Sequence, residues 1–213
     1  MKKILLTIAA IATFTYNGIA QESKSDIREN LMFGMKAGLN YSNVYDAKGE
    51  QFVANPKLGI VAGAFVSIPI GKFMGIQPEI LFSQKGFGAK GTLFSMPYEF
   101  TRSTNYIDIP LLFSLKPTTF ISIVAGPQFS YLLKRTDAYV SNLVNIEQQT
   151  EFENDNIRKN TLGFVIGADI NINHLVFGAR AGWDLQNNVG DGTSTTPRYK
   201  NVVYQATVGF RIY

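Results

Sequence analysis

Residues 73–86, FMGIQPEILFSQKG, decide the fold because they carry a pattern that the rest of the chain repeats. Apolar residues take one set of alternate positions: Met74, Ile76, Pro78, Ile80 and Phe82. Apart from Leu81, the other set is small or polar: Gly75, Gln77, Glu79, Ser83 and Lys85. A period of two predicts a β-strand with one apolar face and one polar face.

Seven further segments show the same alternation: residues 31–41, 57–69, 106–115, 120–133, 161–171, 175–186 and 201–212. Long and short connections alternate between them: residues 42–56, 70–72, 87 to about 102, 116–119, 134–160, 173–174 and 188–200. An up-and-down meander places all the long loops at one end, and the short turns and both termini at the other. This asymmetry is typical of outer-membrane barrels. The sequence therefore predicts an all-β fold, a closed eight-stranded antiparallel up-and-down transmembrane β-barrel.

The apolar face could point into a soluble, lipocalin-like carrier or outward into a membrane. The polar positions carry mostly glycine, serine, asparagine and glutamine, which fit the narrow interior of an eight-stranded barrel. Aromatic residues on the apolar positions fall toward strand ends, as two membrane girdles do. The expected girdles are Tyr41, Phe82, Tyr131, Phe164, Trp183 and Tyr204 at the loop end, and Phe33, Phe113, Phe177 and Phe210 at the turn end. We therefore expect the apolar face to contact lipid.

The first 20 residues match a secretory signal peptide. Lys2 and Lys3 precede an apolar run of about 13 residues, and Gly18-Ile19-Ala20 forms a small-x-small cleavage site. A transmembrane helix is the alternative, but it would need roughly 20 apolar residues. We expect residues 1–20 to be cleaved, residues 21–30 to form a polar lead-in and residues 31–213 to form the barrel domain.

Composition and motifs exclude several other classes of protein. The absence of cysteine excludes a disulfide framework and a lipid-modified cysteine anchor. The formal charge of +4 includes Lys2 and Lys3, so the mature chain is too weakly basic to indicate nucleic acid binding. Residues 86–91, GFGAKG, match G-x-G-x-x-G but lack a following helix, so we interpret them as a glycine-rich loop. The only histidine, His174, is expected in a turn, so we predict no catalytic, cofactor or metal site and no enzyme.

Charged and amide residues on the polar positions are expected to meet inside the barrel as a lumen network: Lys36, Glu79, Asp108, Gln128, Asp169, Arg180, Asp184 and Gln205. Buried charges must be paired or hydrated. The favoured interpretation is a structural network, centred on Glu79 with Lys36 and Arg180, that fills a narrow lumen. The alternative is a gate whose carboxylates and bases exchange partners to open a small ion path.

Three segments together resemble signatures of the PorT-like outer-membrane β-barrel family: residues 76–86 (IQPEILFSQKG), 106–112 (YIDIPLL) and 124–127 (VAGP). The resemblance covers about residues 31–213. It implies the outer membrane of a Gram-negative bacterium, insertion by the barrel assembly machinery and, in some relatives, a link to type IX secretion and gliding. The sequence departs from the family at its terminal aromatic residue, because Tyr213 falls on the polar set of positions.

We therefore expect an integral outer-membrane barrel of structural or binding type, with a side-chain-filled lumen and four external loops. The alternatives are a small gated channel, an accessory of type IX secretion or, third, a soluble carrier. The expected partners are outer-membrane lipids and, during insertion, the assembly machinery, with no nucleic acid. The protein is expected to be a monomer, and the loop ligand stays open.

Overall fold

The structure is a computed structural model that describes residues 26–45, 53–93, 96–141, 145–150, 158–188 and 199–212. These residues form one short 3-10 helix and nine strands: η2 (Ile27–Glu29), β1 (Met32–Tyr45), β2 (Val53–Pro69), β3 (Met74–Leu93), β4 (Met96–Leu115), β5 (Ile121–Ser141), β6 (Asn145–Thr150), β7 (Asn160–Ile172), β8 (Leu175–Asp184) and β9 (Lys200–Ile212). The expected signal peptide and Tyr213 lie outside the described residues.

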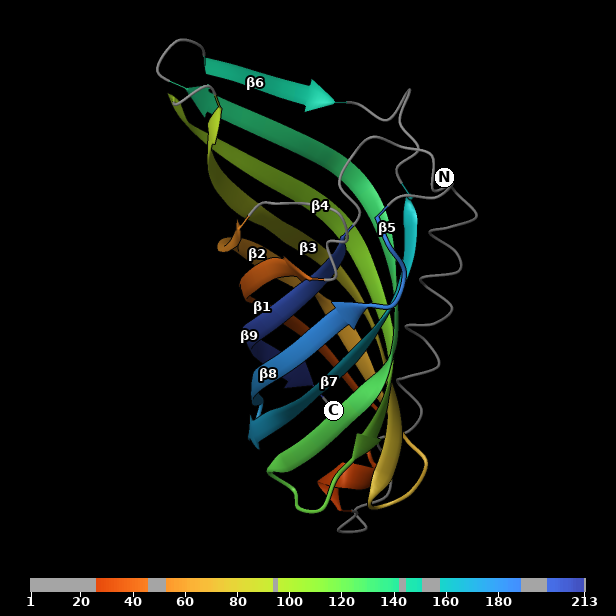
Figure 1. The fold of residues 1–213 in the computed structure, drawn as a ribbon. Coiled ribbons are helices and arrows are strands. Elements are labelled where there is room, and N and C mark those ends of the chain that lie inside the picture. The colour runs from red at the N-terminus through yellow and green to blue at the C-terminus, as the bar shows by residue number, and fades with distance from the viewer. Residues whose placement is uncertain are drawn as a thin grey trace, which may run out of the picture.

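Eight of the strands close into a barrel (Figure 1). The strands follow the order β4-β3-β2-β1-β9-β8-β7-β5, and pairing of β4 with β5 joins the two ends of the sheet. Every pair of neighbours is antiparallel. The closed eight-stranded barrel that the alternation predicts is confirmed. The ninth strand, β6, pairs with β5 and extends the sheet beyond the barrel.

The barrel is apolar outside and polar inside. Met35 is 72% exposed and Leu111 53% exposed, whereas Lys36 and Glu79, on the alternate positions, are buried. This distribution is the reverse of a soluble protein, where large apolar side chains gather inside. The soluble carrier alternative, which needs the apolar face inward, is therefore wrong. No helix within the described ranges is long and apolar enough to cross a membrane.

Three of the four predicted long loops are shorter than expected, because the strands continue beyond the apolar alternation. β3 and β4 pair as far as Leu93 and Met96, within the loop predicted from residue 87 to about residue 102. β1 and β2 extend into residues 42–56, and the predicted loop 134–160 contains the end of β5 and all of β6. Outside a bilayer both faces of a strand can contact water or protein, so backbone pairing continues without an apolar period.

The short turns lie at one end of the barrel, together with η2. A two-residue turn, Asn173-His174, joins β7 to β8 where the sequence predicts it. Asn173 has φ 51°, a left-handed conformation that asparagine tolerates better than most residues. The segment η2 lies across this end, at the bottom of Figure 1, whereas β6 lies at the opposite end.

Candidate functional site

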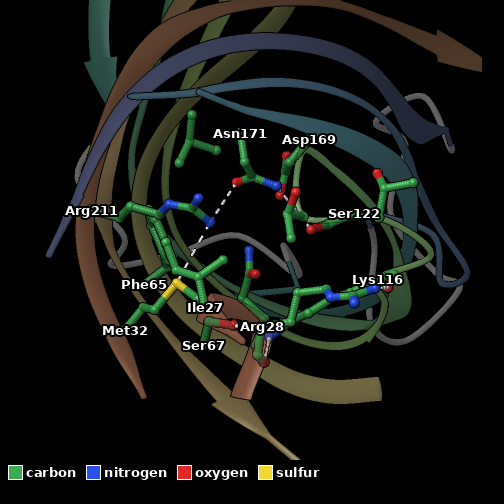
Figure 2. A pocket seen from close by; sticks show the side chains of 14 residues that line it. Ile27, Arg28, Met32, Phe65, Ser67, Lys116, Ser122, Asp169, Asn171 and Arg211 are labelled. Atoms are coloured by element: carbon green, nitrogen blue, oxygen red, sulfur yellow. Dashed lines mark hydrogen bonds between the residues drawn. The ribbon is translucent and has the colours of Figure 1, made fainter. Parts of the chain in front are cut away.

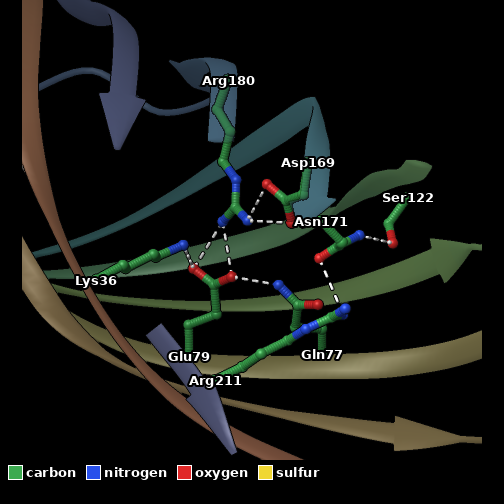
Figure 3. Close-up of polar contacts among 8 residues, drawn as sticks. All are labelled: Lys36, Gln77, Glu79, Ser122, Asp169, Asn171, Arg180 and Arg211. Atoms are coloured by element: carbon green, nitrogen blue, oxygen red, sulfur yellow. Dashed lines mark hydrogen bonds and ion pairs between the residues drawn. The ribbon is translucent and has the colours of Figure 1, made fainter. Parts of the chain in front are cut away.

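A layer of four charged side chains crosses the middle of the lumen (Figure 3). Glu79 accepts a hydrogen bond from Lys36 Nζ at 2.5 Å and two from Arg180 Nη1 at 2.7 Å. The other terminal nitrogen of Arg180 donates to both oxygens of Asp169, at 3.1 and 3.0 Å. Gln77 Nε2 also donates to Glu79, at 2.9 Å. The layer contains two cations and two anions, so its formal charge is zero.

The strand order shows that this layer spans the barrel. Glu79 lies on β3 and Arg180 on β8, and each direction around the closed sheet leads from one strand to the other in four steps. The two residues therefore approach one another from opposite walls. Lys36 approaches from β1, midway between these strands along one side, and Asp169 from β7, next to β8.

Glycines on neighbouring strands make room for the layer. Gly167 lies opposite Arg180, and Gly178 lies opposite Asp169. A Cβ atom on Gly167 would lie 2.6 Å from Arg180 Cγ, and one on Gly178 would lie 2.8 Å from Asp169 Oδ1. These contacts are too close for a side chain, so the glycines of the polar face let the long charged groups fold across the lumen.

A second group of polar side chains lies on the loop side of the layer. Lys85 Nζ donates to Asp108 Oδ1 at 3.0 Å and to Ser130 Oγ at 3.4 Å, and Gln128 donates to the same hydroxyl at 3.2 Å. Asp184 Oδ2 accepts from the backbone and side chain of Asn201, at 3.2 and 2.5 Å.

The eight residues predicted as one network thus occupy four groups. Lys36, Glu79, Asp169 and Arg180 form the layer. Asp108 and Gln128 belong to a second group, in which Lys85 donates to Asp108 and to Ser130, and Gln128 donates to Ser130. Asp184 contacts Asn201, and Gln205 donates to Asn40 at 3.1 Å. Lys85, Asn201 and Asn40 belong to these groups without being among the eight, although their alternate positions place them on the polar face.

Two cavities flank the charged layer. The turn-side cavity (Figure 2) is small, with a volume of about 20 Å³, and is lined by Gln77 and Asp169 among others. The loop-side cavity also has a volume of about 20 Å³ and is lined by Lys85, Arg180 and Asp184 among others. Because Asp169 borders one cavity and Arg180 the other, their ion pair lies between the two spaces.

Arg102 closes the loop end of the lumen. Its guanidinium donates to both carboxylate oxygens of Asp137 at 2.7 Å and to Tyr199 Oη at 3.3 Å. The same group lies within 6.0 Å of the ring centres of Phe87, Phe100 and Tyr199. This cluster was not predicted, because residues 87 to about 102 were expected to form a loop. The alternation of Arg102 and Thr104 with Ser103 was the available signal.

At the turn end, Arg28 of η2 enters the barrel mouth. It donates to the carbonyl oxygens of Lys116 and Pro117 at 3.3 and 3.2 Å, and it lies 4.9 Å from the ring centre of Phe73. Asp26 accepts two side-chain hydrogen bonds from Arg28, at 2.9 and 2.6 Å, and forms an ion pair with Lys72 at 3.3 Å. Hydrogen bonds from Arg28 hold the pKa of Asp26 far below its usual range. These contacts fasten η2 over the opening.

All ten residues of the expected girdles lie on the alternate strand positions whose side chains face outward from the barrel. Tyr41 pairs with Tyr204 at the loop end, and the rings of Phe164 and Trp183 lie 5.5 Å apart. At the turn end, Phe210 stacks on His174, with ring centres 5.4 Å apart. His174 Nδ1 lies 2.9 Å from the carbonyl oxygen of Arg211. Across the residues that the structure describes, no group of three or more histidine, cysteine or acidic residues could hold a metal.

The family model described as outer membrane protein beta-barrel domain matches residues 19–190. The chain belongs to this family. Membership of the outer membrane protein beta-barrel domain family agrees with the inside-out barrel, and it places the protein in the outer membrane of a Gram-negative bacterium. No curated protein matches the sequence.

Several solved structures are similar to this outer-membrane barrel. The attachment invasion locus protein Ail of Yersinia pestis, solved with the heparin analogue sucrose octasulfate, is 11% identical with a TM-score of 0.50, covering 86% of this chain and 99% of Ail. Neisserial surface protein A is 10% identical with a TM-score of 0.46, covering 84% and 96%. OprG from Pseudomonas aeruginosa is 13% identical with a TM-score of 0.41, covering 88% and 100%. Likeness at this level of identity concerns the fold.

Proposed function

We propose that this outer-membrane protein is a non-conducting barrel of structural or binding type that acts through its external loop end. The observation that carries the proposal is the ion pair between Glu79 on β3 and Arg180 on β8, which joins opposite walls of the lumen. Both side chains are almost fully buried, and Lys36 adds a second ion pair to Glu79 while Asp169 adds a second ion pair to Arg180. Arg180 Nε is the one nitrogen of this guanidinium without a hydrogen-bond partner among the described residues. A lumen crossed in this way leaves no open path for solutes.

Two further closures support a filled lumen. The Arg102 cluster lies at the loop end, and the Arg28 contacts lie at the turn end. A diffusion pore needs a continuous aqueous channel, which is typical of barrels with more strands. The ends of β3, β4 and β5, together with β6, project beyond the barrel and offer an extended surface for a binding role (Figure 1).

The proposal includes several finer assignments. We infer that the protein is not an enzyme, because the one histidine of the sequence, His174, stacks on Phe210 at the turn end and faces the carbonyl oxygen of Arg211 through Nδ1. The alternative is a PorT-like role as an accessory of type IX secretion, which the sequence resemblance suggests. Two residues of the segments that carry this resemblance, Glu79 and Asp108, lie inside the barrel. Removal of residues 1–20, insertion by the assembly machinery and a monomeric state belong to the same proposal.

A small gated channel is the second candidate, and one specific observation favours it. A small cavity lies on either side of the charged layer, so the layer is the barrier between them. Arg180 contacts both carboxylates of the layer and could exchange between them, which is how ion-pair gates open.

Planar-bilayer recordings separate the two candidates. The purified wild type is compared with Glu79→Ala and Arg180→Ala, and with Lys134→Ala at the loop end as the control. The proposed closed barrel predicts a silent wild type and a silent control, and silence of both layer variants as well would remove the gated channel. Stepwise currents through the wild type would contradict the proposal and support the gated channel.

A further inference from the structure

The outer wall of the barrel changes from apolar to polar at the same level on three neighbouring strands, β3, β4 and β5 (Figure 1). An apolar row crosses these strands at paired positions, formed by Phe82, Ile107 and Tyr131. The next row of outward-facing pairs is polar, formed by Gln84, Asn105 and Lys134. An apolar band that ends in aromatic residues marks the boundary between lipid chains and lipid headgroups. The polar row therefore lies at the level of the headgroups.

A lysine of the adjoining strand reaches the same level. Lys57 of β2 extends across Gly86, where an added Cβ atom would lie 3.2 Å from the lysine Cδ, and it donates a hydrogen bond to Ser103 Oγ. Gly86 and Ser103 pair across β3 and β4 at outward-facing positions, one step beyond the polar row. The glycine thus leaves room for the stem of Lys57 to lie along the outer wall while its ammonium group stays at the headgroup level.

The charge of Lys57 has no carboxylate beside it within the described part of the chain. Its partner there is the neutral hydroxyl of Ser103. Among the described outward-facing positions of β2 to β5, the first acidic residue toward the loops is Glu99, which lies four residues from Ser103, or about 13 Å along β4. Lys57 is half-buried, so it has lost part of its hydration and is stabilised by an anion that approaches from outside.

The groups around Lys57 are suited to holding a phosphate oxygen. Gln84 Nε2 donates to Asn105 Oδ1 at 3.3 Å, which fixes the amide of Asn105 and leaves its own NH2 group to donate. Ammonium, hydroxyl and amide groups are all hydrogen-bond donors to phosphate. Together these side chains form an outer polar patch, which consists of Lys57, Gln84, Ser103, Asn105 and Lys134.

The surface next to the patch indicates which kind of phosphate fits. Directly on its membrane side lie the apolar row and Leu58, which is 63% exposed. A lipid presents the same order of groups, with a charged phosphate above and apolar chains below. A soluble phosphate would use only the polar part of this surface.

We propose that the outer polar patch binds the phosphate group of an anionic membrane lipid, whose chains lie against Phe82 and Ile107. The patch lies on the outer wall of the barrel. It therefore goes beyond the proposed function, since it depends neither on what the loop end binds nor on whether the lumen conducts.

Native mass spectrometry of the full mature chain in an uncharged detergent tests the patch, with equal amounts of phosphatidylglycerol and phosphatidylcholine as probes. The wild type should retain phosphatidylglycerol in preference to phosphatidylcholine. Lys57→Gln should reduce this preference about fivefold, which is the effect of one lysine at an anionic membrane surface. Lys72→Gln is the matched control, because it removes an exposed lysine at the turn end that forms an ion pair with Asp26, and it should keep the preference. A wild type without preference, or an equal loss in both variants, would overturn the site.

A second measurement needs no substitution, so it holds even if Lys57→Gln fails to fold. Amine acylation followed by mass spectrometry is carried out in vesicles of phosphatidylglycerol and of phosphatidylcholine. Labelling of Lys57, relative to that of Lys72, should be slower in phosphatidylglycerol, and an equal ratio in the two lipids would contradict the site. Inorganic phosphate added to the phosphatidylcholine vesicles separates the two sources of phosphate. Protection of Lys57 by the free anion as strong as that by phosphatidylglycerol would overturn the assignment to a lipid.

Discussion

Glu79→Gln should destabilise the folded barrel strongly, because Glu79 is the acceptor for both cations of the charged layer. The substitution keeps the size of the side chain but removes one of two negative charges. Lys36 and Arg180 are then left with Asp169 alone, and Lys36 loses its 2.5 Å partner. Removal of one member of a buried ion pair typically costs about 3–5 kcal/mol. The 4% exposure of Glu79 supports using this range for a buried pair rather than the smaller values of surface pairs.

The assay is urea unfolding of the protein refolded into lipid vesicles, followed by the gel mobility of unheated samples. Urea slopes of small proteins are about 1–3 kcal/mol per molar, so the expected loss moves the midpoint by at least about 1 M. Lys36→Met combined with Glu79→Gln restores the balance of one cation to one anion. This double variant should recover part of the loss.

The double variant also distinguishes charge imbalance from a simple packing defect. If the free-energy losses of Lys36→Met and Glu79→Gln simply add, the two side chains are not coupled. A loss below about 1 kcal/mol for Glu79→Gln alone would show that the layer is hydrated like a surface pair. Either result would refute the reasoning that the charged layer is a buried and coupled group of ion pairs.

Three further predictions test other parts of the structure. Leu111→Arg places a charge on the lipid face and should cost about 2–4 kcal/mol in the same unfolding assay, whereas a neutral effect would argue against lipid contact there. Gly167→Ala should reduce the folded yield, because its Cβ would lie 2.4 Å from the carbonyl oxygen of Ala179; an unchanged yield would show that the strands separate easily. Hydrogen bonds from Arg28 lower the pKa of Asp26, so docking of η2 is complete above the usual carboxyl pKa of about 4 and weakens only as the pH falls through the lower folded value. Limited proteolysis of η2 should therefore give equal protection at pH 7 and pH 5, and protection that is lost between these values would contradict this.

Alternation was sufficient to predict the strands that cross the membrane. It placed Met35 outside and Lys36 inside, and the same parity gave the correct face to every strand of the barrel within its apolar region. Alternation could not predict which charged side chains pair inside the lumen. The position of a residue along the barrel axis depends on the register between strands that are far apart in sequence. Asp108 therefore contacts Lys85 rather than joining Glu79 in one layer.

The ends of the barrel were harder to predict for a different physical reason. Beyond the bilayer the strands of residues 87–105 lose their apolar period, although their backbone pairing continues. A register irregularity between Asn105 and Tyr106 also shifts the alternation there. At the other end, Arg28 lies in a polar segment without a period, and only the folded structure shows it entering the barrel mouth.

The most direct test of the central claim, an apolar face outside and a charged lumen inside, uses the single tryptophan of the chain. Trp183 lies at an outward-facing position of β8, beside Phe164, at the loop end. In vesicles of brominated lipid, the account predicts strong quenching of its fluorescence by bromine near the headgroup and weak quenching by bromine near the chain ends. Fluorescence that is not quenched by brominated lipid but is quenched by aqueous iodide would place Trp183 in the lumen. That result would contradict the account, because a shift of one residue moves every side chain of a strand to the other face.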